Sequence, residues 1–168
     1  MRLLPLLALL SGCVLHVSGL EPRPNLPGVT SPPSVCVKLD DRILQKTQVG
    51  NVQLDTFRGD LKRGFLNGFP GAVKGEKGET QIQLKRAEPT YECVAYVGCF
   101  AALKYKGSYS GNGEEAITFA GTSRSDLCND LNVCFQSAIE RMYEQLFSAV
   151  KTRLKPSTPK SERPTSET

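Results

Sequence analysis

The sequence predicts a mainly α-helical, small secreted domain that is linked by disulfides, with two or three helices, glycine-rich loops and at most a short strand pair. Three observations favour this fold class: an apolar leader, five cysteines after it, and two stretches with apolar residues at helical spacing. The chain has 168 residues, which suits one domain of ordinary size.

The N-terminus is typical of a signal peptide over residues 1–19. An apolar run from Leu3 to Val14 follows Arg2, and the small residues Ser18 and Gly19 precede the expected cleavage point near residue 20. The run is shorter than the ~20 apolar residues that a membrane-spanning helix needs. We therefore expect a secreted, extracellular protein.

Cleavage at that point removes Cys13 and His16, and His16 is the only histidine of the chain. Without histidine, the mature protein lacks the usual general base and a common zinc ligand, so we expect no enzyme. Acid–base catalysis by the acidic pairs Glu114–Glu115 or Glu140–Glu144 is the alternative, although adjacent carboxylates are usually solvated surface groups. Loss of Arg2 lowers the formal net charge from +4 to +3 (4 − 1), and this mild, dispersed excess predicts no nucleic-acid partner.

The rest of the chain divides into three parts. Residues 20–35 are rich in proline and predict a disordered segment, residues 36–155 predict a single disulfide-linked helical domain, and residues 156–168 predict a disordered Ser/Thr/Pro tail.

The first predicted element of the domain is an amphipathic helix over Val52–Leu66, which Gly59 and Gly64 weaken. Its apolar face carries Leu54, Phe57, Leu61 and Phe65. Glycines punctuate residues 67–80, where a broken Gly-x-y pattern favours a solvated loop over a collagen helix. Residues 81–86 alternate as in a short strand, and the glycines of residues 106–115 predict a flexible loop.

The last predicted element is a long amphipathic helix that begins near Ser123 and Asp126 and ends at Lys155-Pro156. Its apolar residues recur at steps of three and four: Leu127, Leu131, Cys134, Ala138, Met142, Leu146, Val150 and Leu154.

Five cysteines remain after the leader: Cys36, Cys93, Cys99, Cys128 and Cys134. On such a helix the last two side chains point about 120° apart, so we expect each to bridge to Cys93 or Cys99 in either pairing. The sequence does not select among the three possible connectivities. The odd cysteine, Cys36, is a candidate for an intermolecular disulfide in a homodimer.

The stretch Cys128-Asn-Asp-Leu131-Asn132-Val-Cys134-Phe135 resembles the active-site helix of secreted phospholipase A2 enzymes, whose pattern is Cys-x-x-His-Asp-x-Cys-Tyr. It is most similar to the conodipine-like and group XII members. In that family the histidine is the general base and the aspartate helps to bind calcium. Because Leu131 and Asn132 occupy these two positions, the resemblance implies a degenerate, inactive dyad with no cofactor and at most weak calcium binding. A weaker similarity links Asp126-Leu127-Cys128-Asn129 to the closing motif of three-finger proteins.

Two functions follow from these patterns. The first is a non-catalytic phospholipase A2-like module that binds lipid or a membrane surface through the former catalytic slot. The alternative is a secreted interaction, signalling, venom or matrix protein that binds an extracellular protein and whose disulfides are purely structural.

Overall fold

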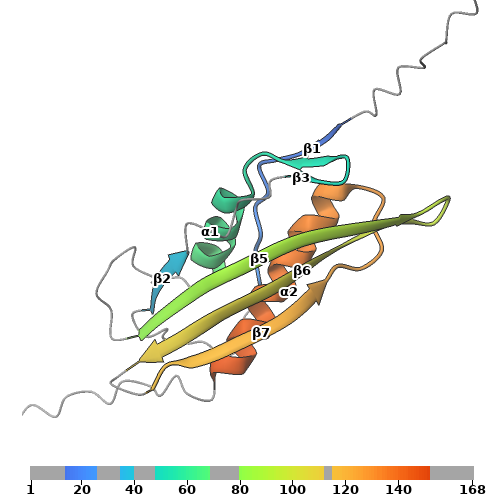
Figure 1. The fold of residues 1–168 in the computed structure, drawn as a ribbon. Helices are drawn as coiled ribbons and strands as arrows, with labels where there is room; N and C mark the ends of the chain where they lie inside the picture. The colour runs from blue at the N-terminus through green and yellow to red at the C-terminus, as the bar shows by residue number, and fades with distance from the viewer. Residues whose placement is uncertain (1–13, 26–34, 40–47, 69–79, 112–114, 152–168) are drawn as a thin grey trace, which may run out of the picture.

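The structure is a computed structural model that describes residues 14–25, 35–39, 48–68, 80–111 and 115–151. Within these ranges two helices lie against a curved sheet, as Figure 1 shows. The elements in chain order are β1 (Leu15–Val17), β2 (Val35–Leu39), β3 (Gln48–Val49), β4 (Val52–Leu54), α1 (Phe57–Gly68), β5 (Thr80–Val94), β6 (Gly98–Gly111), β7 (Ile117–Arg124) and α2 (Leu131–Lys151).

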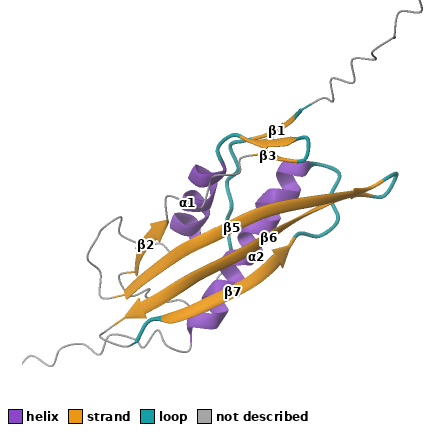
Figure 2. Ribbon diagram, in the orientation of Figure 1, coloured by secondary structure: helices purple, strands orange, loops and turns teal. Residues whose placement is uncertain are grey.

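The main sheet has four strands in the order β2-β5-β6-β7, and a smaller sheet has the order β1-β4-β3. The pairs β5–β6 and β6–β7 are antiparallel, whereas the pairs β2–β5 and β1–β4 are parallel. Both helices lie on the same side of the main sheet, and Figure 2 shows them in purple behind the orange strands. The prediction of a mainly helical fold with at most a short strand pair is therefore wrong.

The long β5–β6 hairpin is the feature that the sequence analysis missed. In β6 the side chains of Ala101, Leu103 and Tyr105 are buried against the helices, while those of Lys104 and Lys106 face solvent. This alternation is that of a half-buried antiparallel strand. The predicted strand at residues 81–86 is one part of β5, and the predicted loop at residues 106–115 continues β6 as far as Gly111.

The first helix was predicted correctly in kind but begins later than expected. Residues 52–54 form strand β4, and α1 runs from Phe57 to Gly68. Its buried apolar residues are Phe57, Leu61 and Phe65, as the spacing predicts. The Tyr143 hydroxyl of α2 donates a hydrogen bond to the Leu61 carbonyl of α1 and so links the two helices.

The second helix begins at Leu131 and not near Ser123. The Asp130 carboxylate caps it, because its Oδ1 accepts the Asn132 backbone N–H at 2.8 Å. Residues up to Arg124 belong instead to β7. The buried face of α2 agrees with the predicted apolar spacing and includes Cys134, Ala138, Met142 and Leu146.

The structure describes residues 14–25 of the segment before α1, while the predicted bounds of the signal peptide and of the disordered segment stay predictions. Strand β1 pairs with β4, and Val17 and Leu20 are 2% and 3% exposed. Residues 20–25 then run across α2, where alternate backbone N–H groups donate to α2 side chains. Figure 1 shows this segment in blue between α1 and α2.

The remaining predictions about organisation fall outside the described residues. These are the leader up to residue 13, the proline-rich residues 26–34, most of the collagen-like stretch and the Ser/Thr/Pro tail. Cys36 lies in β2 opposite Gln81 of β5, and its intermolecular disulfide stays a prediction.

Candidate functional site

The four cysteines at one end of the molecule form two local disulfides. Cys93 bonds to Cys99 across the β5–β6 hairpin, and Cys128 bonds to Cys134 across the start of α2. The predicted bridges between the hairpin and the helix are therefore wrong. Because Cys128 precedes the first turn of α2, the angle expected along a continuous helix does not apply to it.

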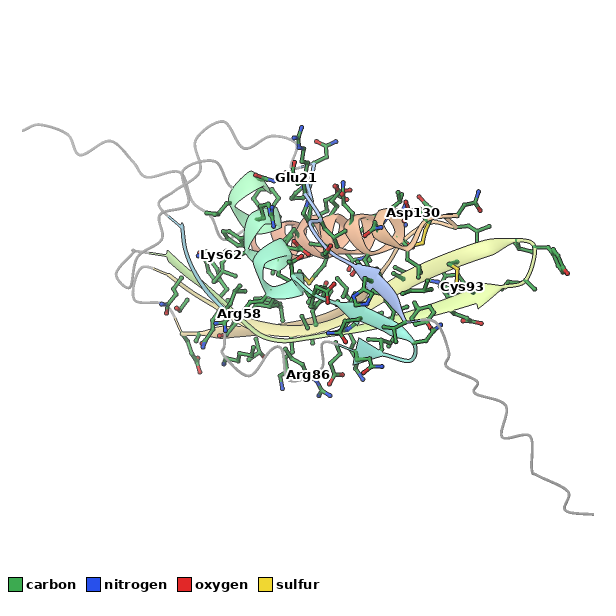
Figure 3. The ribbon with its side chains drawn as sticks, turned by 90° about the horizontal axis from the view of Figure 1, so that it is seen from above. Glu21, Arg58, Lys62, Arg86, Cys93 and Asp130 are labelled. Carbon is green, nitrogen blue, oxygen red and sulfur yellow. A yellow bond between two sulfur atoms is a disulfide. The ribbon has the colours of Figure 1, made fainter. Side chains whose placement is uncertain are left out.

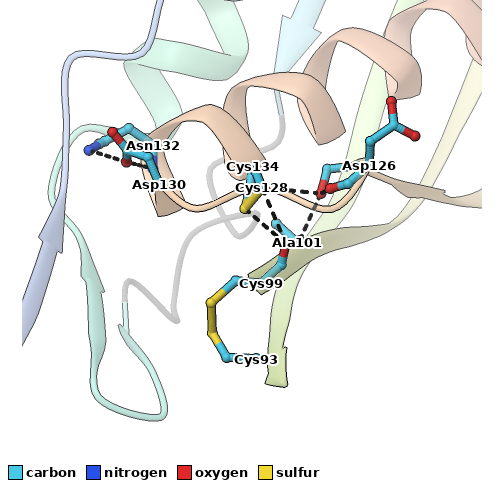
Figure 4. Close-up of a disulfide and its surroundings, with 9 residues drawn as sticks. Cys93, Cys99, Ala101, Asp126, Cys128, Asp130, Asn132 and Cys134 are labelled. Atoms are coloured by element: carbon cyan, nitrogen blue, oxygen red, sulfur yellow. Dashed lines mark hydrogen bonds between the residues drawn. A yellow bond between two sulfur atoms is a disulfide. The ribbon is translucent and has the colours of Figure 1, made fainter. Parts of the chain in front are cut away.

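Backbone hydrogen bonds nevertheless hold the two disulfides side by side, as Figure 4 shows. The Cys99 and Cys128 amides each donate to the other residue's carbonyl at 2.8 Å. The Cys99 carbonyl oxygen also lies 3.3 Å from the Cys128 sulfur and 3.4 Å from the Cys134 sulfur. The hairpin and the start of α2 thus form one braced unit.

The two residues of the supposed degenerate dyad do not form a catalytic slot. Leu131 packs partly against the core, and Asn132 is exposed with both its backbone N–H and its Nδ2 directed to Asp130 Oδ1. This is the geometry of a helix N-terminus. Together with the long antiparallel sheet, it overturns the resemblance to phospholipase A2.

The braced unit carries an exposed apolar surface that the sequence analysis missed. The turn of the hairpin presents Val94 and Val97, and Tyr96 at its tip is fully exposed. Leu127 and Val133, from the segment before α2 and from its first turn, are 53% and 56% exposed. Leu127 lies beneath the turn, since a Cβ atom placed on Gly98 would be 3.1 Å from its Cγ.

Two further exposed apolar residues come from the start of the described chain. Val14 and Leu15 are 48% and 45% exposed, and the Leu15 amide donates to the Asn51 carbonyl at 2.8 Å. Asn51 in turn accepts a hydrogen bond from Tyr91 of β5. Figure 1 shows the start of β1, the start of α2 and the turn of the hairpin at the same end of the molecule.

We name this surface the apolar end and define it by seven residues: Val14, Leu15, Val94, Tyr96, Val97, Leu127 and Val133. Among the described residues, Leu66 on α1 is the other large hydrophobic side chain with comparable exposure. Single exposed apolar residues are common on soluble proteins, whereas a concentration at one end indicates a contact surface.

The backbone conformation of Tyr96 is unusual for a residue with a side chain. Its φ angle is 62°, so it lies in the left-handed region that favours glycine. A non-glycine residue in that region costs of order 1–2 kcal/mol. A strained and fully exposed aromatic residue at the tip of a hairpin is therefore a candidate for contact with a partner.

Several charged groups near the apolar end are engaged within the protein, while Glu92 of β5 is exposed. Arg141 pairs with Asp126, the Asp130 carboxylate caps α2, and the Arg124 guanidinium lies 3.5 Å from the centre of the Phe100 ring. His16 Nδ1 lies 3.0 Å from Asp55 Oδ2. Since His16 and Asp55 are 63% and 39% exposed, this pair is a surface interaction.

Two other places on the molecule are weaker candidates. An open pocket of about 360 Å³ is lined by Glu21, Arg23, Arg63 and Asn67. Its two guanidinium groups are already paired, Arg23 with Glu21 at 3.6 Å and Arg63 with Asp60 at 3.0 Å, so it offers little free charge to an anion. Figure 3 labels Glu21 of this pocket and, apart from it, Cys93 on the hairpin.

The second weaker candidate is the solvent-facing side of the main sheet, where Lys104 and Lys106 are exposed beside Arg86. Arg86 pairs with Glu88 on the same strand. A polar outer face is expected for an antiparallel sheet that has helices on its other side.

Among the described residues, no group of three or more His, Cys, Asp or Glu side chains is arranged to hold a metal ion. The weak calcium binding expected from the resemblance stays a prediction. Within the same ranges, no helix is both long enough and apolar enough to cross a bilayer.

The fold is thus a sheet covered on one side by two helices, and the site is an exposed apolar surface braced by two disulfides. No family model matches the sequence, and a comparison with curated proteins finds no match. Several solved structures are similar to this chain, and the three described below are not named as phospholipases.

The first similar structure is a Xanthomonas campestris protein of the DUF330 family, with 12% identity, a TM-score of 0.43 and coverage of 83% of this chain and 93% of that chain. The second is a minor lipoprotein from Acinetobacter baumannii, with 12% identity, a TM-score of 0.41 and coverage of 77% and 98%. The third is described as an uncharacterized protein, with 10% identity, a TM-score of 0.45 and coverage of 84% and 99%. Similarities this low carry no conclusion about activity.

Proposed function

We propose that this protein is a non-catalytic module that docks on a lipid bilayer through its apolar end. The observation that carries the proposal is the concentration of exposed large apolar side chains at this end, among the residues that the structure describes. Such side chains are stabilised when they leave water, by about 25 cal/mol for each Å² of apolar area buried.

The composition of the apolar end suits a bilayer. Its apolar residues come from the turn of the hairpin and from two other segments at the same end of the molecule. A tyrosine at the tip suits the boundary between acyl chains and headgroups, because its ring is apolar and its hydroxyl remains hydrated.

The charges predict how this binding depends on the lipid. Because the basic side chains of Arg141 and Arg124 near the apolar end are engaged within the protein, binding should depend on apolar insertion more than on attraction to anionic headgroups. Added salt should then have little effect, in contrast to a basic patch on an anionic membrane.

The test uses the chain from Val14 onward, which retains every described residue and lacks the apolar leader. We expect it to float with phosphatidylcholine vesicles. The double change Tyr96→Ser and Val97→Ser should weaken the partition coefficient by about tenfold or more, since loss of about 1.4 kcal/mol of binding energy is tenfold.

The matched control is Leu66→Ser, which removes a similarly exposed apolar side chain from α1. It should leave vesicle binding unchanged. Vesicle binding that Leu66→Ser weakens equally would contradict a specific role of the apolar end. If the chain from Val14 does not bind vesicles at all, the apolar end is instead a contact for another protein, as in the alternative of a secreted interaction protein.

Calcium and hydrolysis provide a second readout in the same assay. We expect no release of fatty acid and no change in vesicle binding when calcium is replaced by a chelator. Release of fatty acid that follows the protein through purification would show that the module is catalytic after all.

A further inference from the structure

We propose that Cys13 is a lipid-attachment residue: the leader is cut between Gly12 and Cys13, and a diacylglyceryl group on the Cys13 sulfur anchors the apolar end to a membrane. The inference extends the function proposed above by naming what holds this end at the bilayer.

The sequence offers two places at which small residues could precede a cleavage point. One is Ser18-Gly19 before Leu20, and the other is Ser11-Gly12 before Cys13, directly after the apolar residues Leu9 and Leu10. Signal peptides are cut after small residues that follow the apolar region. Both places meet this requirement, so the leader alone does not choose between them.

The fold makes the choice, because strand β1 lies between the two places. Cleavage before Leu20 would remove Val17, which is 2% exposed, and the parallel pairing of residues 15–17 with residues 52–54. It would also remove three hydrogen bonds that hold this segment: Leu15 N–H to the Asn51 carbonyl, Asp55 N–H to the Val17 carbonyl, and Gly19 N–H to Thr56 Oγ1. Cleavage before Cys13 keeps all of them.

Cleavage before Cys13 also gives that cysteine an unusual position. It becomes the N-terminal residue, one residue before Val14, where the described chain begins. Val14 and Leu15 are exposed and belong to the apolar end. A lipid on Cys13 would therefore hold this end of the molecule against the bilayer.

The chemistry needs a glycerophospholipid and water as co-reactants. The Cys13 thiol attacks the glycerol carbon that carries the phosphate, so that a carbon–sulfur thioether forms and the carbon–oxygen bond to phosphate breaks. The headgroup phosphate leaves with the electron pair, and the thiol proton is released. Water then hydrolyses the Gly12–Cys13 peptide bond, giving a carboxylate on Gly12 and a free amino group on Cys13.

The energetics agree with a two-chain lipid. A single acyl chain gives only marginal membrane binding, and stable anchoring takes two chains or one chain with a second signal. Two chains at Cys13 with the exposed side chains of the apolar end meet this requirement.

The experiment uses the full chain with its own leader, expressed in a bacterium that lipidates its own exported proteins and fed an alkyne-tagged fatty acid. We expect label on the wild-type protein, an intact mass that corresponds to the chain from Cys13 plus a diacylglyceryl group, and no label on Cys13→Ser. Cys36→Ser is the matched control and should keep full label, because Cys36 lies in β2.

An unlabelled wild-type protein, label that persists in Cys13→Ser, or a mature chain that begins at Leu20 would each overturn the proposal. Failure of the chain from Val14 to bind vesicles, with Cys13 lipidated in the full protein, would overturn only the docking function of the apolar side chains. The two proposals therefore fail separately.

Discussion

At the scale of single residues, Tyr96 has opposite effects on the stability of the fold and on the proposed function. Its left-handed backbone conformation is unfavourable for a side chain with a Cβ atom, and its ring is fully exposed at the tip of the hairpin. The folded protein therefore keeps a residue that destabilises the turn, which is expected where the side chain acts on a partner.

We predict that Tyr96→Gly raises the free energy of unfolding by up to about 1 kcal/mol, because glycine adopts this conformation without strain. The same change should weaken vesicle binding, since the ring is lost. Urea unfolding and vesicle flotation on the same sample measure the two effects. A variant that is less stable and binds equally well would contradict both parts of this interpretation.

Asp60 is the residue whose protonation should affect stability. Its side chain is 1% exposed, and burial raises the pKa of its carboxyl above the usual value of 3.8, while hydrogen bonding from Thr56 and the charge of Arg63 oppose the rise. The folded state thus holds the proton more tightly than the unfolded chain. This contribution to stability is complete below pH 3.8 and is lost as the pH rises through the folded pKa.

Replacement of Asp60 by Asn removes this contribution. We predict that the wild-type protein loses stability relative to Asp60→Asn as the pH rises from 3.8 towards neutrality. Urea unfolding of both proteins across this range gives the difference directly. Parallel pH profiles would mean that Asp60 has the same proton affinity in the folded and unfolded states.

At the scale of elements, the contact between α1, α2 and the segment of residues 20–25 depends on Gly64. A Cβ atom there would lie 2.9 Å from Pro22 Cβ and 2.9 Å from a ring carbon of Tyr143. The glycine that weakens the helix in isolation therefore permits the close approach of its neighbours. Gly59 on the same helix has no atom within 4 Å of such a Cβ.

These two glycines form a matched pair of variants. Gly64→Ala should lower the free energy of unfolding by about 1–2 kcal/mol, because overpacking outweighs the gain in helix propensity. Gly59→Ala should raise it by up to about 1 kcal/mol. Thermal or urea unfolding measures both, and equal effects of the same sign would show that Gly64 is not sterically confined.

The elements also show how far the sequence could predict the fold. The buried faces of α1 and α2 followed from apolar spacing, because a helix repeats its pattern over many residues. The β5–β6 hairpin was missed because a register shift between Leu84 and Arg86 interrupts the alternation of β5. In β6 glycine and serine fill positions where a strand pattern normally shows large residues, with Gly107 lying beneath the Phe119 ring.

The candidate site was harder to predict than the fold. The sequence identified the four cysteines but not their pairing, since the helix was expected to include Cys128 and in fact begins at Leu131. Exposure of the hairpin turn could not be inferred from Cys93-Val-Ala-Tyr-Val-Gly-Cys99, because the same apolar residues would suit a buried segment. Strand β1 was not predicted because its residues were assigned to the signal peptide.

At the scale of the whole molecule, the structure predicts that the segment before residue 20 stabilises the domain. We expect a chain that begins at Leu20 to be less stable than one that begins at Val14 by about 3–7.5 kcal/mol. Burial of one valine contributes about 1.5–3 kcal/mol, and each of the three lost hydrogen bonds contributes about 0.5–1.5 kcal/mol.

Urea unfolding of the two chains checks this prediction, with circular dichroism to show that both are folded. If their free energies of unfolding agree, β1 is dispensable, and cleavage before Leu20 would be compatible with the fold. A difference of the expected size would leave the earlier cleavage point as the one that preserves the native core.

The hydrogen bonds between residues 20–25 and α2 limit how far this segment can follow the helix. The N–H groups of Glu21, Arg23 and Asn25 donate to Gln136, Glu140 and Glu144, while Pro22 and Pro24 between them are buried and have no N–H to satisfy. Two residues of extended chain advance about 6.2–6.8 Å, and four residues of helix advance about 6.0 Å. The two repeats nearly coincide, but the mismatch between them grows with every repeat. Such a series of hydrogen bonds can therefore continue for only a few repeats before donor and acceptor are too far apart.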